Sequence, residues 1–122
     1  MATLKNPNDA VTVAPGVILT IVQIAALSVE GVTGMSSLPG SVDRWLRRTS
    51  AQDGVRLSLE DGSVRLDIYL HADVSRSLYE TCRGVQEAVA RTIKEYVGMD
   101  VIAVNVHIED VDFPALAERS EQ

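Results

Sequence analysis

The chain has 122 residues, the size of one domain, and carries a net charge of −6 at neutral pH. A domain of this length buries roughly two thirds of the surface that its unfolded chain exposes, so no second domain is needed. The negative charge argues against a general nucleic-acid binder, because such proteins neutralise phosphates with Lys and Arg. A single cysteine cannot form an intrachain disulfide, and the first residues do not resemble a secretion signal. These features predict a reducing, cytoplasmic compartment.

Residues 1–9 contain Asn, Pro and Lys without any period, which is typical of a flexible tail. Pro15 suits the first position of a helix, and Gly31 suits the turn that follows one, so a helix is predicted up to Val29. The pattern that follows indicates one domain over residues 10–112. Residues 113–122 begin with a strand-ending proline and are expected to form a polar tail.

The first helix is apolar on nearly every side. Its spacing favours a core stripe of Ile18, Ile21, Val22, Ala25 and Val29. The side chains expected to point away, and therefore to be interface candidates, are Leu19, Gln23, Ala26 and Leu27. A membrane span needs about 20 apolar residues, and this run is shorter and interrupted by polar side chains. Burial under the following loop and self-association both remain open.

Residues 35–52 are predicted to be a loop, and Trp45 and Arg47 within it are further contact candidates. The sequence G-V-T-G from Gly31 to Gly34 resembles the loop with which KH domains clamp a nucleic-acid backbone. A KH-like nucleic-acid-binding domain is therefore the alternative function, and it would also use Arg44, Arg47 and Arg48. Two glycines after a helix are, however, more often a cap and a turn.

Residues 54–72 read as a β-hairpin, because apolar residues alternate on both sides of Asp61 and Gly62, a pair typical of tight turns. The outward set on the second strand includes Tyr69 and His71. Residues 77–97 form an amphipathic helix pattern that ends at Gly98.

A strand is expected over Val101–Asp112, with Ile102, Val104, Val106 and Ile108 facing the core and Asn105 and His107 facing outward. A helix that crosses over between two strands makes those strands parallel, and the connection is expected to be right-handed. The fold class is therefore α+β, in the order α-β-β-α-β. We expect a three-stranded mixed sheet with two helices packed on one face.

Few side chains indicate chemistry. His71 and His107 could come together on the open face of the sheet, which makes them weak metal candidates. The lone Cys82 lies on the apolar side of its helix and is expected to be an inert core thiol. No nucleophile, phosphate-loop or zinc-thiolate motif is present. We therefore expect no enzyme activity, no catalytic residues and no cofactor.

The order of these motifs resembles the alkaline shock protein family, also called the Gls general-stress family of envelope stress response proteins. The resemblance extends over residues 11–111. The segments that carry it are V-A-P-G-V-I from Val13, I-A-A-L-S-V-E-G-V from Ile24, G-V-R-L from Gly54, L-D-I-Y-L from Leu66, V-Q-E-A-V from Val85 and V-N-V-H-I from Val104.

The resemblance implies a small non-enzymatic domain that self-associates as a homo-oligomer. It also implies action at the cytoplasmic side of the cell envelope, where family members are held to the membrane by a separate anchor protein. The chain itself is not expected to span the membrane. No catalytic residue is carried over by the resemblance.

Overall fold

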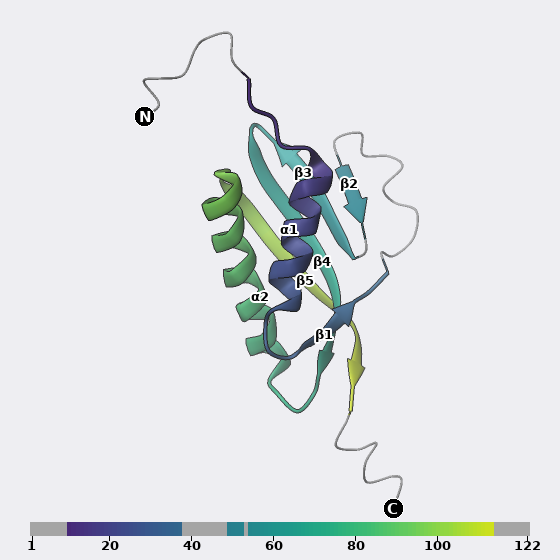
Figure 1. Ribbon diagram of the computed structural model, residues 1–122. Helices are drawn as coiled ribbons and strands as arrows, with labels where there is room; N and C mark the ends of the chain where they lie inside the picture. Colours follow the sequence, from purple (N-terminus) through teal and green to yellow (C-terminus); the bar gives the residue numbers. More distant parts are fainter. Residues whose placement is uncertain (1–9, 38–48, 53, 114–122) are drawn as a thin grey trace, which may run out of the picture.

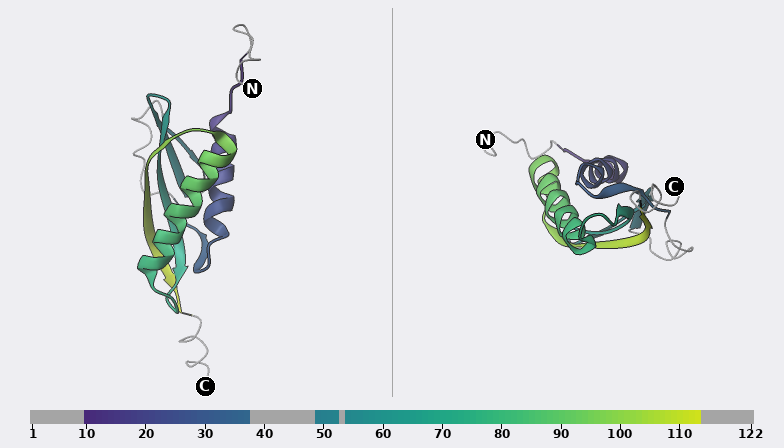
Figure 2. Two further views of the ribbon diagram at one scale, coloured as in Figure 1. Left: turned by 90° about the vertical axis from the view of Figure 1, so that its left-hand side faces the viewer. Right: turned by 90° about the horizontal axis from the view of Figure 1, so that it is seen from below.

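The computed structural model describes residues 10–37, 49–52 and 54–113. Two helices lie side by side on one face of a twisted sheet, and the opposite face of the sheet carries neither of them (Figures 1 and 2). The α+β class and the placement of both helices on one face are as predicted. The sheet has five strands instead of three, because two short strands were not foreseen.

The centre of the sheet is β4 (Ser63–Asp73). β5 (Val101–Asp112) pairs with it in parallel along one side, and β3 (Val55–Glu60) pairs with it antiparallel along the other. The hairpin turn between β3 and β4 has Asp61 at φ 52° and Gly62 at φ 79°. These are the two left-handed positions that an Asp-Gly turn supplies, so the predicted hairpin is confirmed.

The two additional strands extend this sheet. β1 (Val32–Met35) pairs antiparallel with the C-terminal part of β4. It lies along the same edge of β4 as β3, which pairs with the N-terminal part of that strand. β2 (Thr49–Gln52) pairs antiparallel with β3 and forms an outer strand. Both segments lie in parts of the chain that the sequence indicated as loop.

α2 (Leu78–Thr92) begins at Ser77, whose hydroxyl accepts a hydrogen bond of 3.2 Å from the backbone N–H of Glu80. Such a cap satisfies one of the N–H groups that a helix start leaves without a partner. The helix continues as a π-helical turn, η3 (Ile93–Val97), which closes with a 2.9 Å bond from Gly98 N to the Ile93 carbonyl. Gly98 has φ 79°, so the predicted glycine stop is confirmed.

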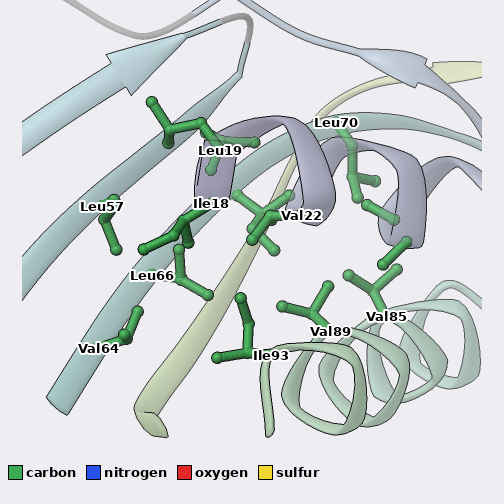
Figure 3. Packing of buried hydrophobic residues seen from close by; sticks show 14 of the residues in the cluster. Ile18, Leu19, Val22, Leu57, Val64, Leu66, Leu70, Val85, Val89 and Ile93 are labelled. Carbon is green, nitrogen blue, oxygen red and sulfur yellow. The ribbon is translucent and has the colours of Figure 1, made fainter. Parts of the chain in front are cut away.

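The core lies between the helices and the sheet (Figure 3). Every second residue of β4 contributes, and these meet apolar residues of α1 (Pro15–Leu27) and α2. The fully or almost fully buried members include Ile18, Leu19, Val22, Leu57, Val64, Leu66, Ile68, Leu70, Val85, Val89 and Ile93.

β5 contains an irregularity that changes which residue faces the core. Val101 pairs with Val64, but Ala103 pairs with the next residue of β4, Arg65, so Ile102 is an extra residue without an opposite partner. The prediction that Ile102 faces the core is therefore wrong, and its side chain is 46% exposed. After the bulge the phase is restored, so Val104, Val106 and Ile108 pack against the core as predicted.

Candidate functional site

The outer face of α1 is the clearest apolar surface. Val17, Ile24 and Leu27 are 49%, 64% and 47% exposed. Together with Thr20, which is also exposed, they form a line along the helix that we call the outer stripe. Large aliphatic side chains so exposed on one helix make this stripe a candidate contact surface.

The sequence prediction placed this face incorrectly. Leu19 is 3% exposed and Ala26 is fully buried, so neither points away from the core as expected. Ile24, in contrast, points to solvent. The physical reason is that α1 is apolar on all sides, so no polar side shows from the sequence which way the helix is turned about its axis. Its packing over β1, β2 and β3 fixes that orientation. Of the remaining candidates on α1, Gln23 is half-buried and Leu27 is exposed.

The outer stripe has no charged neighbours on its own helix. No acidic or basic residue occurs between Pro15 and Ser28. The hydroxyl of Thr20 donates to the Gly16 carbonyl at 3.0 Å, and that of Ser28 donates to the Ala25 carbonyl at 2.7 Å. Both polar side chains are thus already hydrogen-bonded, so covering them costs little free energy.

A shallow depression lies between α1 and the end of the second helical segment. It has a volume of about 290 Å³ and is lined mainly by apolar atoms, from Ile21, Ile24, Ala25, Ser28, Thr92 and Tyr96. Tyr96 belongs to η3 and is 74% exposed. The aromatic ring of Tyr96 therefore lies beside the C-terminal half of the outer stripe.

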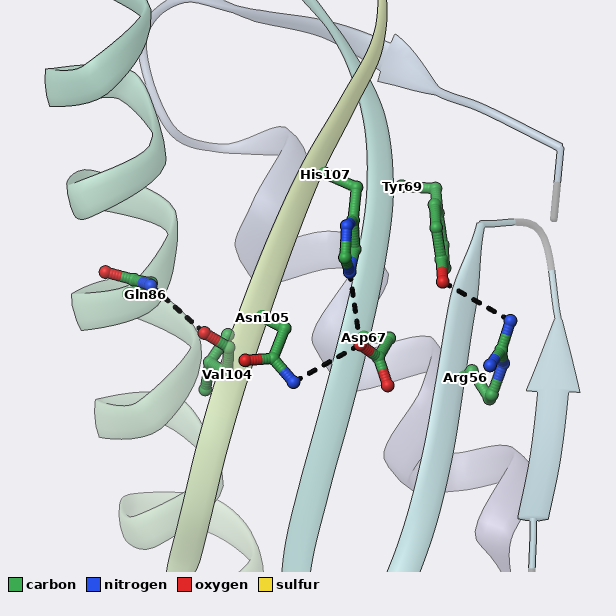
Figure 4. Close-up of polar contacts among 7 residues, drawn as sticks. All are labelled: Arg56, Asp67, Tyr69, Gln86, Val104, Asn105 and His107. Carbon is green, nitrogen blue, oxygen red and sulfur yellow. Dashed lines mark hydrogen bonds and ion pairs between the residues drawn. The ribbon is translucent and has the colours of Figure 1, made fainter. Parts of the chain in front are cut away.

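The open face of the sheet holds a polar network instead (Figure 4). Asp67 accepts a hydrogen bond from the side-chain amide of Asn105 at 3.2 Å and lies 3.1 Å from His107 Nε2. The ring of His107 stacks on Tyr69, with 4.5 Å between the ring centroids. The Tyr69 hydroxyl in turn lies 3.3 Å from a guanidinium nitrogen of Arg56. These side chains hold one another in place across three strands.

This network determines how exposed two of the interface candidates, Asn105 and Tyr69, are. Asn105 is exposed, but Tyr69 is only 7% exposed, because it is covered on the open face instead of lying free on it. An exposed contact role for Tyr69 was therefore a wrong expectation. The sequence identified the face but could not show the stacking.

The two histidines occupy different places in the ladder. His107 pairs in register with Tyr69, and His71 pairs with Asp110. Among the residues that the structure describes, no three His, Cys, Asp or Glu side chains are grouped so as to hold a metal ion. The cluster expected around His71 and His107 is therefore not assembled as a metal site in this part of the chain.

Cys82 is partly buried, and this burial raises the pKa of its thiol above the usual value. A raised pKa disfavours the thiolate, which is the nucleophilic form. The raised pKa is in the direction expected of an inert thiol, but the half-buried side chain lies outside the core cluster, so the expected core position is wrong.

The G-V-T-G segment does not form a loop. Gly34 lies inside β1 and pairs with His71, and Gly31 forms the turn before the strand with φ 101°. A clamp for a nucleic-acid backbone needs an open loop at this position, so the structure contradicts the KH-like alternative there. Trp45 and Arg47, and likewise Arg44 and Arg48, lie outside the described residues.

A model of the alkaline shock protein 23 family, described as having a cell envelope-related function, matches residues 3–113 of the chain. The chain belongs to this family. The resemblance to alkaline shock proteins is thereby confirmed, and the family carries an envelope-related function. No helix among the described residues is both long enough and apolar enough to cross a membrane.

This alkaline shock protein has relatives in Bacillus subtilis and Streptococcus pyogenes. YqhY of Bacillus subtilis (strain 168) is 29% identical over 110 residues, which cover 88% of this chain and 81% of YqhY. YloU of the same strain is 23% identical over 111 residues, covering 88% of this chain and 92% of YloU. Spy1535 of Streptococcus pyogenes serotype M6 is 28% identical over 102 residues, covering 83% of this chain and 78% of Spy1535.

Solved structures of MamM CTD variants have a similar fold. One matches with a TM-score of 0.55 and 18% identity, covering 78% of this chain and 95% of that chain. Another, in a zinc form, matches with a TM-score of 0.54 and 17% identity, covering 78% and 84%. At such identities the likeness shows the α+β fold alone.

Proposed function

We propose that this chain is a non-enzymatic scaffold domain, formed by residues 10–112, that self-associates and acts at the cytoplasmic side of the cell envelope. A membrane-anchored partner protein would hold it there. The observation that carries the proposal is the outer stripe of α1, an exposed aliphatic line on a helix without charged residues. The envelope-related description of the family supports the location.

The oligomeric state of the full chain tests self-association. At tens of micromolar, the wild-type chain should sediment as an oligomer. Ile24→Glu places a carboxylate in the middle of the outer stripe, where association would remove it from water, and it should weaken association at least about tenfold, or 1.4 kcal/mol. Analytical ultracentrifugation over a concentration series measures this change.

Two tyrosines provide a matched control. Tyr96 and Tyr79 are both 74% exposed and lie towards opposite ends of the second helical segment, but only Tyr96 lines the depression beside α1. Tyr96→Glu should shift the oligomer toward monomer, whereas Tyr79→Glu should leave it unchanged. A monomeric wild type, or an Ile24→Glu variant that associates as strongly as wild type, would refute self-association through this face.

The proposed location has a separate test in the native cell. The chain should be recovered with the membrane fraction and should resist protease added outside intact spheroplasts. It should become sensitive once the membrane is opened. Cleavage in intact spheroplasts would place the chain on the other side of the membrane and contradict the proposal.

A further inference from the structure

We propose that two copies of this chain pair through the outer stripes of α1 in antiparallel orientation. The two-fold axis would pass near the middle of the helix. Val17 of one copy would then lie against Leu27 of the partner subunit, and Thr20 against Ile24 of the partner subunit. This inference rests on the proposed self-association and specifies its interface.

The spacing of the outer stripe fits a helix pair. Val17, Thr20, Ile24 and Leu27 follow one another at intervals of three, four and three residues. This is the a/d spacing of the seam along which two helices pack with interlocking side chains. The opposite side of the same helix, with Ile18, Val22 and Ala25, is already buried against the sheet. A second helix is therefore the occupant whose shape matches this line.

Charge favours a second copy of this chain as that occupant. The chain carries a net charge of −6, so two copies repel each other overall. α1 has no charged side chain, and so its pairing with itself avoids that repulsion. The Thr20 hydroxyl keeps its bond to the Gly16 carbonyl, so the interface would bury no unsatisfied hydroxyl at this position.

The helix ends favour the antiparallel direction. α1 has no acidic residue in its first turn and no basic residue in its last turn, so its own side chains leave the helix dipole without a compensating charge. An antiparallel partner places the positive end of one dipole beside the negative end of the other.

The depression beside α1 fits the same arrangement. It is lined by Ile24, Ser28 and Tyr96, which places it near the C-terminal half of the outer stripe. In an antiparallel pair, that half meets the N-terminal half of the partner's α1. Val13, which precedes α1 and is 41% exposed, would extend the contact there.

Disulfide cross-linking of the full chain distinguishes the orientations. The native Cys82 is first replaced by serine, and Val17→Cys and Leu27→Cys are prepared as separate variants, one with a mass label. Ten helical residues separate the two positions, about 15 Å along the axis. A disulfide needs Cα atoms within about 7 Å, so in an antiparallel pair neither variant can cross-link to itself.

We expect a cross-linked heterodimer when the two variants are mixed under mild oxidation, and no cross-linked dimer from either variant alone. Homodimers of each variant alone, with no preference for the mixed species, would show parallel pairing and overturn the orientation. An oligomeric wild type without any of these cross-links would overturn the α1 interface while leaving self-association intact. A monomeric wild type would overturn both proposals.

Discussion

Leu19→Glu should unfold the domain, whereas the same substitution at Leu27 should leave it folded. Leu19 is 3% exposed and packs in the core beside Ile18 and Val22, so a carboxylate there would be buried without a partner. Lost packing and the buried charge together cost several kcal/mol, which is comparable with the whole stability of about 5–15 kcal/mol of an ordinary domain. Far-ultraviolet circular dichroism and thermal unfolding measure the loss.

Leu27→Glu is the matched control for this prediction. The same two residue types are exchanged on the same helix, but Leu27 is 47% exposed. At a concentration low enough for the wild type to be monomeric, the two unfolding midpoints should be close, and only the association at higher concentration should weaken. Equal destabilisation by the two substitutions would mean that α1 is rotated differently about its axis from the arrangement described above.

Gly54→Ala should destabilise the fold strongly, because Gly54 lies where three strands meet. Its carbonyl accepts a 2.7 Å bond from Tyr69 N, and the Tyr69 carbonyl accepts a 2.9 Å bond from Ser36 N. A Cβ on Gly54 would approach the backbone oxygens of Ser36 and Tyr69 to 2.6 and 2.7 Å. Gly54 also has φ 80°, which alanine adopts only with strain. We expect a loss of roughly 3 kcal/mol or more in urea unfolding.

Gly62→Ala separates the strain from the clash. Gly62 has φ 79°, almost the same as Gly54, but a Cβ there meets no atom within 4 Å. Its loss should therefore be limited to the backbone strain, about 1–2 kcal/mol. If both variants unfolded at the same urea concentration, the close approach of the strands around Gly54 would not be a determinant of stability.

The types and order of the main elements could be predicted from local patterns. Ser77 and Gly98 mark the two ends of the second helical segment, and Asp61 with Gly62 specifies the hairpin turn. Each of these signals acts within a few residues. The parallel pairing of β4 and β5 could be predicted because a helix crosses over the sheet between them.

The additional strands could not be predicted in the same way. β1 is only four residues long and contains a glycine, and β2 is also short. Such segments carry little strand propensity of their own. They become strands because the neighbouring edges of β4 and β3 offer backbone hydrogen bonds, and this depends on the assembled sheet.

The candidate interface, likewise, could be predicted from the sequence only in part. The sequence identified α1 as an unusually apolar helix with surplus hydrophobic surface, but it selected Leu19 and Ala26 where the structure exposes Val17 and Ile24. On β5, the bulge at Ile102 likewise shifted a side chain out of the core. On β5 one extra residue changes the face that a side chain occupies, whereas on α1 the packing against the assembled sheet decides it.

By itself, the sequence determined the α+β class, the boundaries set by caps and turns, and the absence of charge on α1. Only the tertiary structure decided which side of α1 faces solvent, where β5 bulges and how Tyr69, His107 and Asp67 are joined. The physical reason is the difference in polarity between the two sides of an element. A helix with one polar side is oriented by its own sequence, whereas a helix that is apolar all round is oriented by the surfaces it packs against.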